Sequence, residues 1–447
     1  MLKIYKVWSA VMEINWQEVK QEASGYLSQL VQLNTTNPPG YEMLAIQFLK
    51  SVAERNGLYT TIQTTGEQRG NIIISLESTY ENPTILLSHV DVVPADEADW
   101  DVHPFSGAII EDTLWGRGTI DTKQLTITHL MILILLRRNN ISFGKKIVMV
   151  ATADEENGSK YGLLALLKTE GALFTNATVF NEGGGFPIAL EGQNYYLAEM
   201  GQKGVARFKL TVVHQQGDNP YMPSNAAMQT IMQVIQQVMN ANITEPLPHI
   251  TEMMFQTICK RQGIAFDKDD LTAFFNQIPE HLVTMFKAMT KTTFSITKWN
   301  GGRKHPSLKG STEIIIDCRT LPFVDEGAVK SYIEELIKGL PVDYDLFQFS
   351  QGYETKLNDQ MLKLFEQNLQ GEVKDAVVVP YLSIGSSDGR HLLPYQSKVY
   401  GYCPMLPDMS FDKVIKMVHG VNEKIPLESL RFGILNMYNI LLSIGKE

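Results

Sequence analysis

Hydrophobic and polar residues follow two different rhythms along the first third of the chain. Apolar positions recur at helical spacing over WQEVKQEASGYLSQLVQLN (16–34), and this pattern stops at NPPG (37–40), where two prolines and a glycine cannot continue a helix. Continuous apolar runs at 82–93 and 145–153 instead predict buried strands, with an apolar helix over 122–138 between them. This strand, helix, strand order predicts an α/β fold with a mainly parallel central sheet covered by helices.

A different pattern begins after residue 200. Strand and helix signals follow one another there in the order β-α-β-β-α-β, with a helical insertion over 240–293 that is rich in methionine and phenylalanine. Such a unit folds as one ferredoxin-like sheet with two helices on one face. After about residue 351, strand and helix signals alternate again as in the first part of the chain. We therefore expect one α/β domain, formed by 1–199 and 351–447, that is interrupted by a smaller inserted domain at 200–350.

Composition narrows the classes of function. The chain has 447 residues, 44% of them hydrophobic and 20% charged, as is typical of soluble globular proteins. A net charge of −10 argues against nucleic acid or an anionic membrane surface as a partner, because repulsion would replace counterion release. The three cysteines form no CxxC pair, which argues against a disulfide framework and favours a reducing, cytoplasmic location. The apolar segment 125–136 is too short to span a bilayer, and the amino end is interpreted as non-secretory.

Histidine and carboxylate residues follow the predicted strands. The run 145–153 leads directly into DEE (154–156), and clustered like charges are costly to bury unless a cation or a proton compensates them. His89 and Asp91 lie two apart on a predicted strand, so Asp91 could orient a metal-bound imidazole, although an exposed polar strand end is the alternative. Asp121 stands just before the apolar helix, either as a ligand or as its N-cap. Each motif falls where open α/β sheets place ligands.

These residue types are typical of a metal site. Histidine and carboxylate ligands without a thiolate suit zinc, or cobalt or manganese in its place. Two ions about 3.5–4 Å apart could share one carboxylate and lower the pKa of a water between them. Of the neighbours Glu155 and Glu156, one could then bind metal while the other moves the proton of that water to a leaving group.

Five motifs, in order along the chain, resemble those of a known family. With SHVDVVPA, WGRGTIDTK, ADEENGS, FNEGGGF and HGVNEKIPLESL, the chain resembles the di-zinc metallopeptidases that include carboxypeptidase S, glutamate carboxypeptidase, aminoacylase, acetylornithine deacetylase and succinyl-diaminopimelate desuccinylase. NTTNPPG and PFSG add to the resemblance, which extends from near the amino end to the carboxyl end. It implies a zinc-peptidase-like catalytic domain with two zinc ions per chain, and an inserted domain that acts as a lid and dimerisation surface.

The resemblance also implies roles for individual residues. His89 is expected to bind one zinc ion and Glu156 the other, while Asp121 bridges the two. Glu155 is expected to be the general base. His419, which opens HGVNE, matches the last metal ligand of the family.

Two further roles depend on the downstream motifs. The remaining metal ligand should be an acid after the glutamate pair, where the chain has Asn181 and Glu182; a neutral amide is a poor zinc ligand, so Glu182 is expected, and the site would be weak if it pointed away. Arg319, in DCRTLP, matches the arginine that holds the substrate carboxylate, a task that suits its planar fork.

Three segments of the sequence depart from the family's pattern or match it only in part. The family's lid carries a histidine that reaches the partner subunit's site, and the matching stretch GDNPYMP (217–223) has Asp218 in its place. Losing one oxyanion donor of this kind typically costs about two to three orders of magnitude in rate. The loop HPSLKGS (305–311) also differs from the family's pattern, which leaves the substrate class open. Asp388 and Arg390 either line the pocket or serve as an N-cap and a surface charge.

Together these observations predict a zinc-dependent hydrolase in the cytoplasm. Its substrate would be a small peptide or N-acyl amino acid, cleaved at the amide bond next to a carboxylate-bearing residue, as in a dipeptidase, carboxypeptidase or deacylase. A homodimer could form through the inserted domain. The alternative is a metal-binding or regulatory relative with impaired turnover, which Asp218 and the HPSLKGS loop motivate and the retained Glu155 opposes.

Overall fold

The computed structural model of the chain folds as two compact units. It describes residues 14–77, 83–141, 146–214, 225–302, 310–356 and 358–445. Unit 1 comprises the described residues of Met1–Glu199, Thr355–Pro380 and Ser387–Glu447, and unit 2 comprises those of Met200–Glu354 and Tyr381–Ser386. Asp218 and most of the HPSLKGS loop lie outside the described residues. The three predicted domain ranges, and the lid and dimerisation roles expected for 200–350, stay predictions.

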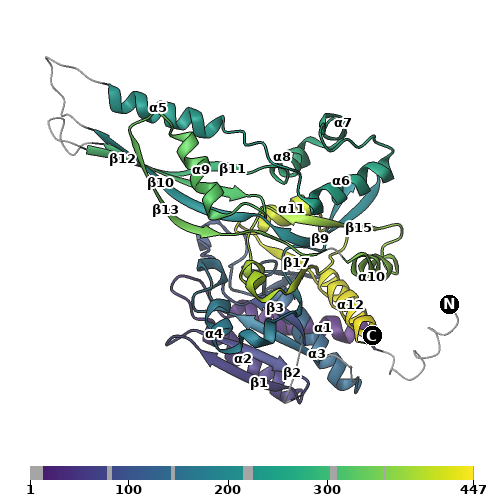
Figure 1. Cartoon of the computed structure of the whole chain (residues 1–447). Helices are drawn as coiled ribbons and strands as arrows, with labels where there is room; N and C mark the ends of the chain where they lie inside the picture. The colour runs from purple at the N-terminus through teal and green to yellow at the C-terminus, as the bar shows by residue number, and fades with distance from the viewer. Residues whose placement is uncertain are drawn as a thin grey trace. The chain divides into compact units, whose positions relative to one another are not determined.

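Unit 1 is built around a sheet whose central strands are parallel (Figure 1). Strands β6, β3, β7 and β16 lie next to one another in that order and pair in parallel, whereas β1 and β2 on one side and β9 on the other pair antiparallel. This confirms the predicted α/β fold with a mainly parallel central sheet. The bounds are β1 (Tyr59–Thr64), β2 (Gly70–Ser75), β3 (Thr84–His89), β6 (Ile147–Thr152), β7 (Thr178–Asn181), β9 (Gln193–Gln202) and β16 (Lys398–Gly401).

The apolar runs of the sequence become the centre of this sheet. Every residue of β3 and of β6 is buried. These strands have neighbours on both edges, and helices cover the faces of a parallel sheet. Between them in the chain, α3 (Lys123–Arg138) is buried along nearly its whole length and packs on both strands. An apolar character all round the helix, rather than on one stripe, is what such a position requires.

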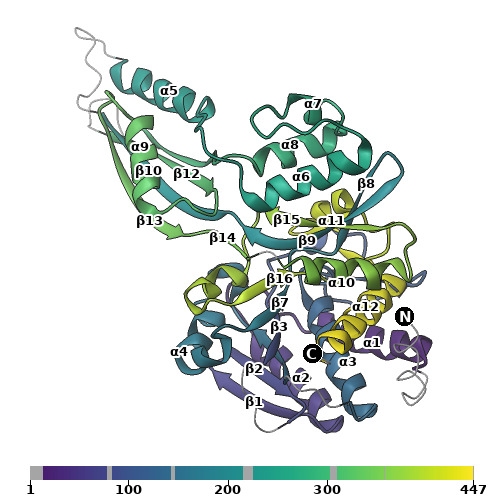
Figure 2. The same cartoon turned by 45° about the vertical axis from the view of Figure 1, so that its right-hand side comes forward.

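Further helices surround α3 and the sheet (Figure 2). α1 (Trp16–Gln32) and α12 (Leu427–Ile444) contact each other and α3, and α2 (Glu42–Arg55) packs on β1 and β2. The side chain of Asn15 caps α1 by accepting hydrogen bonds from the backbone N–H groups of Gln17 and Glu18. The other helices of unit 1 are α4 (Leu163–Phe174), α10 (Asp359–Gln370) and α11 (Phe411–Met417). In the described ranges, no helix combines the length and apolar character needed to cross a membrane.

Unit 2 contains a four-stranded antiparallel sheet in the order β11, β12, β10, β13 (Figure 1). Helices α5 (Ala226–Met239) and α9 (Glu326–Leu336) contact each other and pack against this sheet, which gives the predicted β-α-β-β-α-β order. The helical insertion forms α6 (His249–Gln262), α7 (Thr272–Phe275) and α8 (Glu280–Ala288). The strand bounds are β10 (Gly204–His214), β11 (Thr293–Gly302), β12 (Gly310–Thr320) and β13 (Val342–Ser350).

Candidate metal centre

The predicted ligands come from five segments of unit 1. His89 is the last residue of β3, Glu182 comes directly after β7, and the turn η3 (Glu155–Asn157) follows β6. Because these three strands are parallel neighbours, their carboxyl ends lie at the same edge of the sheet, where α/β proteins place their ligands. The other two ligands join them from outside the sheet, since Asp121 precedes α3 and His419 follows α11.

Asp121 lies between the two histidines. Its Oδ1 is 3.2 Å from Nε2 of His89, and its Oδ2 is 3.2 Å from Nε2 of His419. His89 Nε2 is also 3.5 Å from Oε2 of Glu182, and His419 Nε2 is 3.0 Å from Oε2 of Glu156. The five side chains therefore form two groups that share one carboxylate.

Asn181 and Glu182, the two candidates for the remaining ligand, have different contacts. The side-chain amide of Asn181 is buried and donates a hydrogen bond to Oγ of Ser387 at 2.9 Å, so it is engaged elsewhere. Glu182 points its carboxylate at His89. The acid, and not the amide, reaches the histidine.

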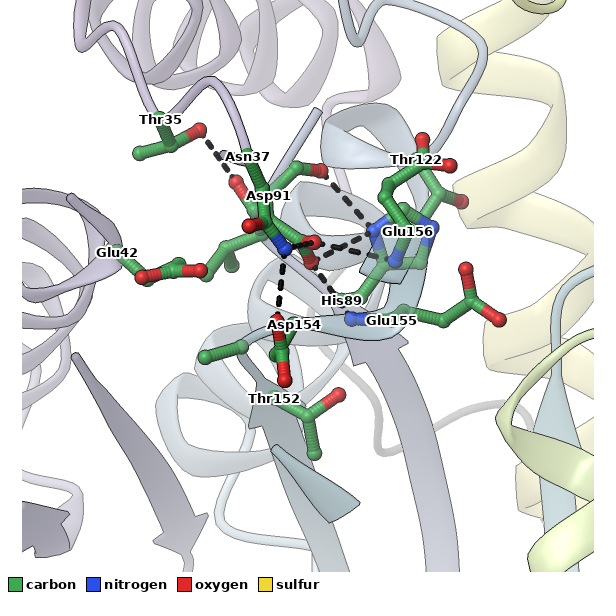
Figure 3. A network of polar contacts seen from close by, with 12 residues as sticks. Thr35, Asn37, Glu42, His89, Asp91, Thr122, Thr152, Asp154, Glu155 and Glu156 are labelled. Atoms are coloured by element: carbon green, nitrogen blue, oxygen red, sulfur yellow. Dashed lines mark hydrogen bonds and ion pairs between the residues drawn. The ribbon is translucent and has the colours of Figure 1, made fainter. Parts of the chain in front are cut away.

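Asp91 holds the turn that carries the two glutamates (Figure 3). Its Oδ1 accepts a hydrogen bond from the backbone N–H of Glu155 at 3.1 Å, and its Oδ2 accepts one from that of Glu156 at 3.1 Å and one from Nδ2 of Asn37 at 2.8 Å. The contact with His89 is shared: Nδ1 lies 3.0 Å from the backbone oxygen of Asp91 and 3.4 Å from Oδ1. Because β3 ends at His89, the strand alternation that suggested a carboxylate partner for the imidazole does not extend to Asp91.

Asp154, at the start of the turn, is anchored by residues that were not singled out in the sequence. It has a φ of 63°, in the left-handed region that aspartate tolerates better than most residues. Its Oδ1 accepts hydrogen bonds from Nδ2 of Asn37 (2.9 Å) and Nη1 of Arg69 (2.5 Å), and its Oδ2 accepts one from the backbone N–H of Tyr161. Asn37 thus touches both Asp91 and Asp154, so the NPPG segment supports the turn; α1 itself already ends at Gln32.

Arg390 contacts the predicted general base. Its Nη1 lies 3.2 Å from Oε1 of Glu155. Asp388 is buried and accepts hydrogen bonds from Oγ1 of Thr152 at 2.9 Å and from Oγ of Ser159 at 2.5 Å. Asp388 is therefore not the N-cap that was one interpretation of SSDGRHLL, since Ser387 caps the following 3-10 turn. Arg390 is not a surface charge, since its side chain is only 13% exposed and contacts Glu155.

Carboxylates outnumber cations in this cluster. Burial, reinforced by Asp121, raises the pKa of Glu156 to about 7. Burial, reinforced by Glu182, holds the pKa of Glu155 well above its usual range. Hydrogen bonds to Asp121 and Glu156 raise the pKa of His419 to about 10. Raised pKa values favour the protonated forms of these side chains, because protonation reduces the repulsion between neighbouring carboxylates. A bound metal cation would reduce the same repulsion.

The donor set fits a divalent metal. Nitrogen and oxygen ligand atoms lie within 4.8 Å of one another in the group His89, Asp121 and Glu156 and again in the group His89, Glu155 and Glu182. Oε1 of Glu156 is buried and has no hydrogen-bond partner among the described residues, an expensive state for a carboxylate oxygen unless a cation accepts it. Imidazole and carboxylate suit zinc, and also manganese or cobalt.

Arg319 belongs to unit 2. It lies on β12 and donates a hydrogen bond through Nε to Oδ1 of Asp317 at 2.7 Å. This ion pair holds its guanidinium in one orientation. Its role toward a substrate carboxylate stays a prediction.

Comparisons with known proteins agree with the fold and identify the family. Residues 85–443 match the family described as Peptidase family M20/M25/M40. The chain is 25% identical over 370 residues to the N-fatty-acyl-amino acid synthase/hydrolase PM20D1 of Bos taurus, covering 78% of this chain and 71% of that protein. It is 24% identical over 389 residues to the probable carboxypeptidase S-like 2 of Dictyostelium discoideum, covering 81% and 72% of the two chains.

Among solved structures, an M20 family metallo-carboxypeptidase, Sso-CP2 from Sulfolobus solfataricus, has a similar fold. The TM-score is 0.71 at 17% sequence identity, and the match covers 94% of this chain and 98% of that one. The match of the family over most of the chain agrees with the metal-ligand cluster at the edge of the sheet. The chain therefore belongs to peptidase family M20/M25/M40, whose members are metal-dependent hydrolases of peptide and amide bonds.

Proposed function

We propose that this protein is a di-zinc hydrolase that cleaves a peptide or N-acyl amide bond next to a residue with a free carboxylate. The observation that carries the proposal is the position of Asp121, which faces His89 with one oxygen and His419 with the other. Glu182 completes the first group and Glu156 the second. A carboxylate that faces two imidazoles is well placed to be shared by a pair of ions about 3.5–4 Å apart.

The ions would supply Lewis acidity, which polarises the scissile carbonyl and acidifies a water molecule. Glu155 does the proton transfer. It takes a proton from the attacking water on its carboxylate and later delivers that proton to the departing amine nitrogen, so the same group serves first as base and then as acid. Asp91 supports this role by fixing the backbone N–H of Glu155, and the Arg390 guanidinium fixes Oε1 of its carboxylate.

What the two named relatives have in common supports this substrate class. An N-acyl amino acid and the carboxyl-terminal end of a peptide both carry a free carboxylate beside the amide bond. A planar guanidinium such as that of Arg319 suits this group, because it can form two parallel hydrogen bonds with it. We extend the proposal to a cytoplasmic enzyme that dimerises through unit 2, with zinc replaceable by cobalt or manganese.

A second candidate is a metal-binding relative with little turnover. Asp218 favours it, because a carboxylate at the family's lid histidine position cannot donate to an oxyanion unless it is protonated. The support that Glu155 receives from both Asp91 and Arg390 speaks for a catalytic role.

The experiment is a hydrolysis assay on the protein with its metal removed and with zinc, cobalt or manganese restored. The panel would contain dipeptides and N-acyl amino acids, each paired with the same compound whose carboxylate is converted to an amide. We expect activity only after metal is restored and only on the free acids. Activity that survives metal removal would contradict the metal site, whereas equal activity on the amidated compounds would contradict the substrate class. Two bound ions without turnover on any compound would favour the second candidate.

A further inference from the structure

Glu423 is a fully buried carboxylate that the proposed reaction does not use. It lies in the same HGVNE segment as His419. The hydrogen bonds of its side chain, however, go to residues 117–121, the loop that carries Asp121. Oε1 accepts from the backbone N–H groups of Ile120 at 2.5 Å and of Asp121 at 3.0 Å. Oε2 accepts from the backbone N–H of Gly118 at 3.0 Å and from Nη1 of Arg117 at 2.9 Å. Four donors satisfy both oxygens of this ion in the protein interior.

Arg117 also binds the backbone of the loop that carries His419. Its Nη2 donates a hydrogen bond to the backbone oxygen of Gly420, the residue after His419, at 2.7 Å. The guanidinium is 3% exposed and lies over the ring of Trp100, 5.2 Å from the centroid, which restricts its orientation further. Glu423 and Arg117 together therefore form a clamp between the residues that carry Asp121 and those that carry His419.

The segment around His419 needs such support. His419 has a φ of 56°, in the left-handed region that most residues with a side chain adopt only when their surroundings impose it, and Asn422 has a φ of 58°, which asparagine tolerates better. The side chain of Asn422 is tied to Asp101 by two hydrogen bonds of 2.9 Å. The distance of 3.2 Å between His419 Nε2 and Asp121 Oδ2 thus depends on how these two loops are held together.

We propose that Glu423 is a positioning residue for both metal ions, because it sets the place of the bridging Asp121 relative to His419. The inference rests on the proposed metal centre and deepens it. A purely structural Glu423 would change the stability of the fold without changing how the metal ions are bound. A positioning Glu423 would change the binding of both ions, since both depend on Asp121.

The test is Co²⁺ binding to the full-length Glu423→Gln variant, followed by absorption spectroscopy and by competition with a chelating dye. The substitution keeps the size of the side chain but directs an NH₂ group at N–H donors. We expect the affinity for both ions to fall by about 10- to 100-fold, as is common when a group that orients metal ligands is lost. The Co²⁺ spectrum should change as well, because the ligand geometry is altered.

Glu245→Gln is a matched control. Glu245 lies in unit 2 and accepts hydrogen bonds from the backbone N–H and hydroxyl of Thr292 and from the hydroxyl of Tyr332, so its loss tests the general cost of removing a hydrogen-bonded carboxylate. Metal binding by this variant should match wild type. The unfolding temperature of each metal-free variant separates loss of stability from loss of ligand geometry.

Arg117→Lys is the second variant, for use if Glu423→Gln does not fold. It keeps the charge but replaces the planar fork that joins Glu423 to Gly420. Here the ion next to His419 should weaken more than the ion next to His89. Two Co²⁺ ions bound with wild-type affinity and spectrum, in whichever variant folds, would overturn the positioning role. Wild type that binds no Co²⁺ would instead overturn the proposed metal centre, and this inference with it.

Discussion

The two histidines that face Asp121 occupy different surroundings. The side chain of His89 is 1% exposed and comes from the last residue of a central parallel strand, whereas that of His419 is 54% exposed and comes from a loop. His89 also contacts the backbone oxygen and the carboxylate of Asp91 through its second nitrogen. His419 is positioned by the loop itself, through the clamp formed by Glu423 and Arg117.

This difference indicates how the centre is built. The His89 side is part of the sheet, so its geometry is largely set before a metal binds. The His419 side depends on contacts between two loops, and water reaches its imidazole. We expect the first side to contribute to the stability of the fold and the second side to be the one at which metal affinity is most easily changed.

The largest effect is expected from the residue that the two sides share. Asp121→Ala removes the bridging carboxylate and should abolish tight binding of both ions, together with hydrolysis. Metal content after dialysis, measured by atomic emission, checks this. A variant that keeps one tightly bound ion would mean that the two ligand groups do not depend on a common carboxylate.

The histidines themselves should separate the two sides. His89→Ala leaves Glu182 and the carbonyl of Asp91 with a lost partner inside the protein, so the free energy of unfolding of the metal-free protein should fall by about 1–3 kcal/mol. His419→Ala also removes ion pairs, with Asp121 and Glu156, but its side chain is half exposed and solvent screens them, so the loss should be smaller than for His89→Ala, although the change removes one proposed metal ligand. Urea unfolding of both variants without metal gives the comparison. Equal losses of stability would contradict the distinction between the two sides.

A smaller effect is expected from changing Asp91, which supports the turn Glu155–Asn157. Asp91→Asn keeps the shape of the side chain but offers only one carbonyl oxygen to the backbone N–H groups of Glu155 and Glu156. We expect activity to fall by about 10- to 100-fold, the range typical of groups that orient metal ligands, while Asp121 and His419 still hold one ion. The ratio kcat/KM with zinc restored is the measurement. Wild-type kcat/KM would show that the turn keeps its geometry without this carboxylate.

The central sheet was predictable because its signals are local. The apolar residues of β3 and β6 form short runs next to polar residues, which favours strands over helices, and the two runs lie on either side of the apolar helix α3 in the chain. Two antiparallel elements, the β1 and β2 pair and the hairpin of β8 (Phe186–Leu190) with β9, were not among the predicted elements. Their hydrophobic alternation is weaker, since β1 is largely exposed while β2 and most of β9 are buried on both faces.

The supporting residues were harder to predict than the ligands. His89, Asp121 and Glu156 belong to residue types and motifs that suggest metal binding on their own. Glu423 and Arg117 lie inside the motifs HGVNEKIPLESL and WGRGTIDTK, but the sequence does not indicate that they pair, because their contact joins residues 306 positions apart. The same holds for Arg69, which reaches Asp154 from 85 positions away, whereas Asn37 belongs to the NPPG segment, which was an available signal.

The most direct test of the proposed reaction is a comparison of wild type with Glu155→Gln, in which both metal content and hydrolysis are measured on the same samples. Glutamine at this position cannot accept the proton of water, while the five proposed ligands remain in place. We expect both proteins to hold two ions per chain and the variant to lose activity by at least about 100-fold, the lower range of general acid–base contributions. A variant with both ions and wild-type turnover would contradict the assignment of Glu155 as the group that moves the proton.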